Sequence, residues 1–498
     1  MWNNGRSGGI LLHPTSLPNQ FGIGDLGKNA YYFIDFLHKH KQCLWQILPL
    51  GITGYGDSPY SSFSSYAGNP FLISPEKLIE VKILSLSEIE DKGFPQSKVD
   101  YGTVIPYKWE LTKQAFHNFS QDSNHFLHKE FISFQENQKH WLDDFALFMT
   151  IKELNNFKPW NLWEDPLKYR QSRTLETWNN EYYEEILFQK FVQFIFFKQW
   201  MDLRNYANQR DILIIGDIPI FVAYDSSDVW ANPSLFMLNK QREMIYIAGV
   251  PPDYFSTMGQ RWGNPLYRWD VHKRQKYRWW FQRILHSFSL VNILRIDHFR
   301  GFEAYWRIPA LEPTINGSWI SGPGYDFFKR LKQRYGILPI IAEDLGVITP
   351  AVDLLLQKTR FPGMCVLQFA FGGFESEYYK NRYLPHNYQK NCIVYTGTHD
   401  NDTTKSWFEN APSEIQDHVL NYLKSNGKDI TGDLIRLAWA SVANMSVIPL
   451  QDLLRLDTKS RMNLPGRETG NWQWRFTWDQ ITPEEGLELK TLSKLYGR

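Results

Sequence analysis

The feature that most constrains the fold of this 498-residue chain is a series of short apolar segments, rich in β-branched residues, that each end in polar or glycine-rich residues. Eight such segments lie at residues 9–13, 44–50, 212–221, 291–297, 337–343, 364–371, 392–396 and 446–450. Amphipathic helical patterns lie between them at 29–40, 274–288, 325–335, 351–358, 413–424 and 434–442. Near-continuously apolar strands that alternate with helices are typical of parallel strands covered on both faces. Eight is the number that closes a (β/α)8 TIM barrel, which we predict, with an open doubly wound sheet as the alternative.

The connection between the second and third segments is too long for one strand–helix–strand unit. Residues 76–208 carry helical patterns rich in Trp and Phe, such as 186–203. We therefore predict a helix-rich subdomain at 76–208, inserted on the C-terminal rim of a catalytic barrel formed by 1–75 and 209–498. A second long connection, 223–273, is expected over the same end, and we predict a lid loop at 249–267 because long loops of compact domains are often functional.

Charge and composition narrow the expected partners. Lys and Arg total 54 against 53 Asp and Glu, a formal net charge of +1. A near-neutral chain lacks the basic surface that binds nucleic acid or anionic lipid, so we expect neither nucleic acid nor a membrane as a partner. Aromatic residues make up 16% of the chain. This excess indicates either a large core or a surface on which flat rings stack, and composition alone leaves both open.

The sequence shows no targeting signal that we can identify. Cys43, Cys365 and Cys392 form no CxxC pair, so we expect free thiols rather than a disulfide framework. The first residues lack a basic region followed by an apolar stretch, and no window approaches the roughly 18 apolar residues of a membrane span. We expect a cytoplasmic protein, either a monomer or a weak homodimer.

Acidic residues stand at the ends of three of the predicted strands. The fourth strand ends in Arg295-Ile-Asp297, the fifth in Glu343, and the seventh is followed closely by Asp400. In a (β/α)8 barrel the chemistry gathers at the carboxyl ends of the strands. Alternation along the strand places Arg295 and Asp297 on one face, where the guanidinium can keep the carboxylate ionised.

Three converging carboxylates suit a reaction that needs a charged nucleophile, a protonatable acid and a group that stabilises a cation. Glycosyl transfer has these needs, because its transition state resembles an oxocarbenium ion and its leaving oxygen takes a proton. For any one of these acids, the alternative is a structural ion pair with a neighbouring arginine. Three acids together at strand ends favour the catalytic interpretation.

Several long strings of this sequence resemble one known family. They are HPTSLPNQFGIGDLG (13–27), GDSPYSSFSSYAGNP (56–70), GDIPIFVAYDSSDVW (216–230), GVPPDYFSTMGQRWGNPLY (249–267), RIDHFRGF (295–302), IAEDLG (341–346), GTHDND (397–402) and NLPGRETGNWQWR (463–475). They resemble the amylomaltases, 4-alpha-glucanotransferases that are related to the α-amylase barrel enzymes. The resemblance implies retaining transfer of α-1,4-glucan segments between maltooligosaccharides or amylose, through a covalent glucosyl–Asp intermediate. By motif, Asp297 resembles the family's nucleophile, Glu343 its acid/base and Asp400 its transition-state stabiliser.

The same resemblance indicates substrate-binding residues outside the three acids. Tyr60 matches a tyrosine that stacks on the sugar beside the scissile bond, while Arg295 and His399 match contacts to the nucleophile and the sugar. Asn463 lies on a matching loop near the cleft, and Asp217 is expected in the supporting network, with core hydrogen bonding as an equal alternative.

The predicted lid loop adds three candidates of its own. Trp262 offers a ring face for a glucose unit, and Asp253 and Gln260 offer acceptors and donors for its hydroxyls. The alternative for Trp262 is packing beneath its own loop.

Two patterns that suggest a cofactor or metal fail on their context. Residues 22–27 fit GxGxxG, but 14–21, with two prolines, separate them from the strand, unlike a dinucleotide fingerprint. No Cys/His pair has zinc spacing, and His298 is expected in a structural or supporting role. We therefore predict no cofactor and no metal.

A starch hydrolase and a catalytically silent glucan-binding protein remain the alternative functions.

Overall fold

The computed structural model describes residues 5–252, 258–372 and 378–498. Its centre is an eight-stranded, all-parallel sheet with the strand order β10-β11-β12-β1-β2-β3-β6-β9. The strands are β1 (Ser7–Leu11), β2 (Leu44–Gln46), β3 (Leu213–Ile218), β6 (Ile293–Ile296), β9 (Ile340–Ala342), β10 (Gly363–Val366), β11 (Cys392–Tyr395) and β12 (Met445–Pro449). The Ala342 N–H of β9 donates to the carbonyl of Pro362, the residue before β10, at 3.0 Å. This bond joins the two strands at the ends of the sheet order and closes the barrel. The predicted (β/α)8 barrel is confirmed, and the open sheet is not what forms.

Each predicted apolar segment overlaps one barrel strand, although β1, β10 and β12 begin one or two residues before their segments. The segments are apolar along their length because both faces of the strands are buried: all four residues of β6 and all four of β11 are buried. The inward face packs the barrel interior, and the outward face packs the helices.

The helices between the strands have the amphipathic spacing that the sequence predicts. In α1 (Lys28–Lys39), for example, the buried residues are Ala30, Phe33, Ile34 and Leu37, which lie on one helical face. The other helices of the barrel layer and its termini are α10 (Arg278–Leu290), α11 (Gly324–Tyr335), α12 (Pro350–Thr359), α13 (Thr404–Glu409), α14 (Ser413–Leu423), α15 (Ile430–Ala440), α16 (Leu450–Leu453) and α17 (Pro483–Tyr496).

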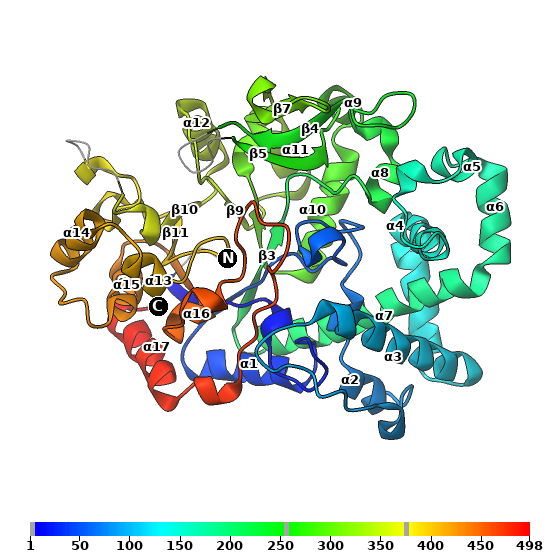
Figure 1. Ribbon diagram of the computed structural model, residues 1–498, viewed down its shortest axis with the longest axis horizontal. Helices are drawn as coiled ribbons and strands as arrows, with labels where there is room; N and C mark the ends of the chain where they lie inside the picture. The colour runs from blue at the N-terminus through cyan, green and yellow to red at the C-terminus, as the bar shows by residue number, and fades with distance from the viewer. Residues whose placement is uncertain (1–4, 253–257, 373–377) are drawn as a thin grey trace.

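The long connection from β2 to β3 is helical and extends to one side of the barrel (Figure 1). It contains α2 (Pro75–Glu80), α3 (Tyr101–Gln121), α4 (His128–Leu154), α5 (Asp165–Lys168), α6 (Ser172–Glu181) and α7 (Tyr183–Asn208). The end of α7 also contacts the barrel's own helices: the Tyr206 hydroxyl donates to Asp35 of α1 at 2.9 Å, and the Trp200 indole donates to the Leu290 carbonyl at 2.9 Å. Because α7 serves both parts, the division at residue 208 stays a prediction.

A four-stranded antiparallel sheet, which the sequence analysis does not anticipate, lies to one side of the barrel strands (Figure 1). Its order is β5-β4-β7-β8, formed by β4 (Tyr246–Val250), β5 (Gln260–Pro265), β7 (Ala304–Pro309) and β8 (Ser318–Ser321). Two short helices, α8 (Ser227–Ala231) and α9 (Trp269–Arg274), flank β4 and β5 in the chain. The segment 249–267, treated above as one long loop, therefore contains the end of β4 and all of β5, and its role as a lid stays a prediction.

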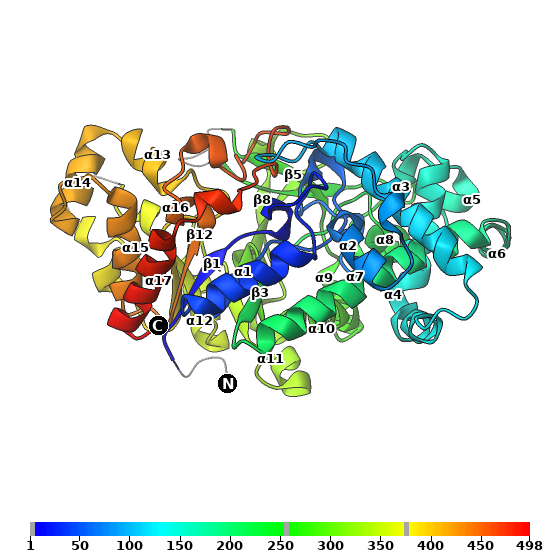
Figure 2. The ribbon, with the colours of Figure 1, turned by 90° about the horizontal axis from the view of Figure 1, so that it is seen from below.

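In Figure 2, α17 and the C-terminus are drawn below α16 and β5. Within the described ranges, no helix combines the length and the apolar character needed to cross a membrane. All three cysteines are free, as expected, although only Cys392 is fully buried.

Candidate active site

Arg295 is the ionic centre of the strand ends. It points from β6 between two carboxylates: its Nη1 contacts Asp217, which ends β3, and its Nη2 lies 3.2 Å from Oδ1 of Asp297. Arg295 and Asp217 are buried, whereas Asp297 keeps 28% of its side-chain surface exposed. The guanidinium Nε also points at the Met364 sulfur, 3.4 Å away on β10. The predicted neighbours Arg295, Asp217 and Asp297 thus lie together.

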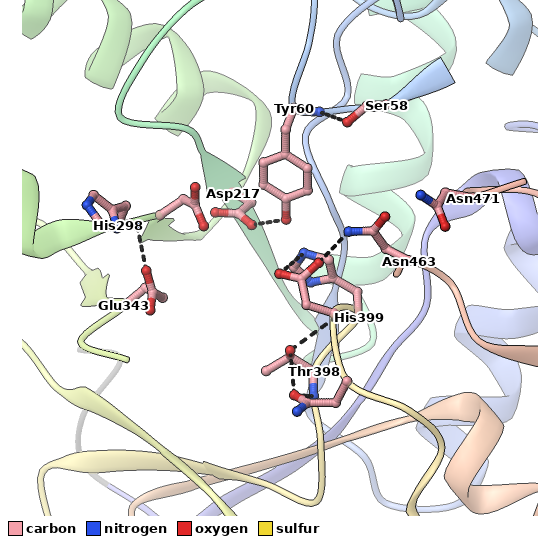
Figure 3. A network of polar contacts seen from close by, with 12 residues as sticks. Ser58, Tyr60, Asp217, His298, Glu343, Thr398, His399, Asn463 and Asn471 are labelled. Carbon is pink, nitrogen blue, oxygen red and sulfur yellow. Dashed lines mark hydrogen bonds and ion pairs between the residues drawn. The ribbon is translucent and has the colours of Figure 1, made fainter. Parts of the chain in front are cut away.

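Tyr60 is joined to the same group from the loop after β2. Its hydroxyl donates to Oδ2 of Asp217 at 2.7 Å (Figure 3). Burial and the charge of Asp217 raise the pKa of Tyr60 well above its usual value, so the phenol stays protonated as the donor. The Asp217 carboxylate therefore accepts from both Arg295 and Tyr60.

Two opposing influences set the pKa of Asp297, its burial and the charge of Arg295. Burial raises its pKa to about 6, Arg295 opposes that shift, and the negative charges of Asp217 and Asp400 add to it. A pKa of about 6 leaves this carboxyl mostly ionised at neutral pH. The partly exposed, ionised carboxylate can serve as a nucleophile.

Glu343 has a different environment. Its Oε2 accepts from the His298 backbone N–H at 2.6 Å (Figure 3), and its Oε1 accepts from the Leu345 N–H at 2.9 Å. Burial is the largest influence and raises its pKa to about 8, with Asp297 adding to the shift and Arg295 and the two N–H donors opposing it. At neutral pH this carboxyl is therefore mostly protonated and can act as an acid.

Asp400 lies on the loop after β11 and is held by side chains. Its Oδ1 accepts from the Asn463 amide at 2.7 Å, and its Oδ2 lies 3.4 Å from the His399 ring nitrogen. The Arg461 guanidinium also donates to the Asp400 backbone carbonyl at 2.6 Å. With 46% of its side-chain surface exposed, Asp400 is open to a ligand while its orientation is fixed.

Aromatic rings line the space between Tyr60 and Asp400. Tyr60 stacks on His399 with ring centroids 5.2 Å apart and an interplanar angle of 13°. Trp472 lies beside both rings, at 5.9 Å from Tyr60 and 6.0 Å from His399.

Trp472 lies in the string 463–475 but is not among the site residues predicted from the sequence. Its φ of 64° is unusual for a bulky residue, and such backbone outliers gather at functional sites. No pattern in a single sequence shows a positive φ at a tryptophan, so only the structure could identify it.

Two residues of β5, Gln260 and Trp262, contact each other close to His298. The Trp262 indole donates to the Gln260 side chain at 3.1 Å, and its ring meets the His298 ring edge-on with centroids 4.8 Å apart. Trp262 is half-buried and packs on the core, so it is neither a free platform nor wholly enclosed. Asp253, the third residue predicted on this segment, lies outside the described residues.

The described ranges hold no group of three or more His, Cys, Asp or Glu side chains placed to bind a metal ion. The acids described above are occupied by an arginine, backbone N–H groups or an amide. What the arrangement offers is one exposed ionised carboxyl, one protonated carboxyl and one oriented carboxyl, all at the carboxyl ends of parallel strands. The fold and site define a (β/α)8-barrel enzyme.

Comparison with known proteins identifies its family. A family profile described as 4-alpha-glucanotransferase matches residues 12–481. The chain is 48% identical to a 4-alpha-glucanotransferase of Synechocystis sp., across 99% of this chain and 98% of the relative, and 46% identical to one of Thermus thermophilus, across 98% of each. Its structure matches the amylomaltase from Streptococcus agalactiae in complex with acarbose, with a TM-score of 0.96, 39% identity and 99% of each chain covered. The chain belongs to the 4-alpha-glucanotransferase family and is an enzyme of that type.

Proposed function

We propose that the protein transfers α-1,4-glucan segments between maltooligosaccharides or amylose by a retaining double displacement, with Asp297 as nucleophile, Glu343 as acid/base and Asp400 as transition-state stabiliser. The observation that carries this proposal is the division of charge between two neighbouring acids. The pKa of Asp297 is raised to about 6 and that of Glu343 to about 8, so between these values one is ionised and the other protonated. Retaining glycosyl transfer needs this pair of states.

In the first step, Glu343 gives its proton to the glycosidic oxygen while Asp297 attacks the anomeric carbon. The bond to the leaving sugar breaks, its electron pair takes the proton, and a glucosyl ester forms on Asp297. Arg295, 3.2 Å from the Asp297 carboxylate, favours the ionised nucleophile and keeps it oriented.

In the second step, ionised Glu343 removes the proton from the 4-hydroxyl of an incoming sugar. That oxygen attacks the anomeric carbon, Asp297 leaves, and the two inversions together restore the α-linkage. The backbone N–H groups of His298 and Leu345 stabilise the ionised form that this step requires.

Asp400 and the aromatic rings would hold the sugar. An oriented, partly exposed carboxylate can accept from ring hydroxyls and stabilise the cationic transition state. The partly buried Tyr60 ring suits a neutral polysaccharide, which binds by stacking and hydrogen bonds rather than by charge, and buried Trp472 supports that ring from beside it.

One incubation separates the candidate activities. With maltotriose as the only substrate, a transferase yields glucose plus longer oligomers, a hydrolase yields only glucose and maltose, and a glucan-binding protein leaves it unchanged. We expect the first result. Absence of oligomers longer than maltotriose would overturn the transferase proposal for this substrate class.

A second experiment tests the covalent intermediate. The E343Q variant should accept an α-maltosyl fluoride donor, because fluoride leaves without a proton, but should release the sugar slowly without its base. Mass spectrometry of the intact and digested protein should then find a maltosyl adduct on the peptide that contains Asp297. E343Q/D297N is the matched control and should carry none. An adduct on another residue, or inverted product, would contradict the double displacement.

A further inference from the structure

The turns that follow β6 and β9 are bonded to each other around Glu343. The His298 and Leu345 N–H groups hold the two oxygens of its carboxyl, one from each turn (Figure 3 shows the His298 bond). The Phe299 N–H also donates to the Glu343 carbonyl at 3.1 Å. The orientation of this carboxyl therefore depends on how the two turns lie relative to each other.

Arg300 spans these turns from behind. It lies two residues after His298 in a short 3-10 helix (Phe299–Phe302) and is buried, with 4% of its surface exposed. Its Nη1 donates to the Val347 carbonyl at 2.5 Å, and its guanidinium lies over the Trp319 ring of β8, 3.8 Å from the centroid. One side chain thus connects the β6 turn, the β9 turn and the antiparallel sheet.

The β9 turn is fixed as far as Asp344, whose carboxylate accepts from the Met364 N–H and from Arg382, and is more open after it. Gly346, between Leu345 and Val347, has a φ of 83°, and the position where a Cβ would stand has no neighbour within 4 Å. Leu345 is half-buried, and Val347 is 52% exposed. The Arg300 bond to Val347 therefore ties this outer part of the β9 turn to the β6 turn, in addition to the His298 and Phe299 bonds to Glu343 itself.

We propose that Arg300 is a positioning residue for Glu343, holding the two turns so that the His298 and Leu345 N–H groups stay aimed at its carboxyl oxygens. This inference rests on the proposed role of Glu343 as acid/base. It adds that the orientation of the Glu343 carboxyl depends on a side chain that contacts neither that carboxyl nor a substrate.

The charged groups that face Glu343 are Arg295 and Asp297 from β6 and its end, and Tyr383 from the connection between β10 and β11. The contacts of Arg300 are to the Val347 carbonyl and the Trp319 ring rather than to the Glu343 carboxyl. Removal of Arg300 should therefore act through the loosened N–H donors. Because these donors favour the ionised carboxyl, loosening them raises the pKa of Glu343, so that less of it is ionised at a given pH.

The test compares R300M and R300K with wild type on two donors, maltotriose and α-maltosyl fluoride. For R300M we expect kcat/KM on maltotriose to fall roughly tenfold to a hundredfold, because the misaligned acid protonates the leaving oxygen poorly. On the fluoride, which needs no proton, the loss should be less than about threefold. The alkaline limb of the maltotriose profile should move to higher pH. R300K should resemble R300M, because an ammonium group cannot hold the carbonyl and stack on Trp319 together as the planar guanidinium does.

R307M is the matched control. Arg307 lies on β7 of the same antiparallel sheet and covers the Tyr246 ring at 4.4 Å, but it makes no bond to the β9 turn. It should keep wild-type rates on both donors. Thermal unfolding of every variant reports folding, and R300K replaces R300M if the latter does not fold.

Two results overturn the inference in different ways. Equal losses on maltotriose and fluoride with an unmoved alkaline limb, or no loss at all, would make Arg300 a purely structural residue. E343Q separates this failure from failure of the proposed function. If E343Q keeps its maltotriose activity, the acid/base assignment falls and the role of Arg300 falls with it. If E343Q loses that activity but keeps the fluoride reaction, only the Arg300 inference is at stake.

Discussion

Asp297 and Asp400 both follow barrel strands, yet the molecule holds them by different means. Asp297 is paired with a buried arginine that also contacts buried Asp217. Asp400 is nearly half exposed and is held by the Asn463 amide and the His399 ring. The β6–β9 side of the cleft is thus a compact group of charges, and the β11 side is an open, hydrogen-bonded arrangement.

The difference indicates a division of labour. Charges packed together at low exposure shift one another's protonation, so the β6–β9 side determines which acid carries a proton. An exposed carboxylate contributes mainly through the orientation of its oxygens. The β11 side therefore determines how a bound sugar is oriented. Substitutions on the two sides should therefore differ in kind as well as in size.

The largest effect is expected from D297N, which removes the nucleophile. Turnover on maltotriose should fall by about four orders of magnitude or more, because no covalent intermediate can form. Folding should survive, since the amide is isosteric with the carboxyl and keeps one oxygen toward Arg295. Product analysis together with circular dichroism measures both effects. Retention of more than a hundredth of wild-type turnover would remove Asp297 from the nucleophile role.

On the open side, D400N and N463A should form a graded pair. D400N should lower kcat by roughly a thousandfold, because the charge beside the cationic transition state is lost. N463A removes one of the holding bonds but leaves the His399 contact, so a loss of about tenfold is expected. If N463A costs as much as D400N, Asn463 contacts the substrate directly rather than acting through Asp400.

The pH profile probes the compact side. We expect kcat/KM to be bell-shaped, with limbs near 6 and 8, because Asp297 must be ionised and Glu343 protonated in the first step. D400N should move the acidic limb to lower pH, since the Asp400 charge raises the pKa of Asp297. The alkaline limb should stay nearly in place, because Asp400 is not among the largest influences on the pKa of Glu343. A shift of both limbs would show that the two sides are not separable.

The same contrast explains how much could be predicted from the sequence. The barrel strands are predictable because burial on both faces makes each one a continuous apolar run, as in β11. The acids that end β6 and β9 follow directly from those strands. The antiparallel sheet leaves no such mark: β8 is almost entirely exposed, and β5 is a polar, glycine-containing segment.

Contacts between loops that are far apart in the chain also could not be predicted from the sequence. Asn463 was predicted to bind substrate, and the structure shows that it donates to Asp400, 63 residues away in the chain. The Arg300–Val347 bond likewise depends on how two barrel turns approach each other. Such tertiary contacts have no periodicity, so a single sequence does not reveal them.

Tyr60 bridges the two sides, and Y60F tests the bridge with a smaller effect. The phenylalanine keeps the ring that stacks on His399 but loses the hydroxyl that donates to Asp217. A loss of about threefold to tenfold in kcat/KM is expected from one missing hydrogen bond to a charged group. Y60A, which also removes the stacking ring, should lose considerably more. Equal rates for Y60F and wild type would assign Tyr60 to stacking alone.

The smallest effect concerns stability and follows from the cost of burying Glu343. Burial raises its pKa from the ordinary 4.5 to about 8, so the folded state holds a proton that the unfolded chain releases above about 4.5. The stability of the wild type therefore falls as pH rises from 4.5 toward 8, and E343Q, which cannot ionise, escapes that loss. The melting temperature of E343Q should match wild type near pH 4.5 and exceed it by about 2 °C at pH 8. Comparing the two proteins at pH 4.5 as well as at pH 8 separates the effect of ionisation from any other effect of the substitution. If E343Q gains nothing on raising the pH, desolvation is not what keeps this acid protonated, and the charge division between Asp297 and Glu343 needs another cause.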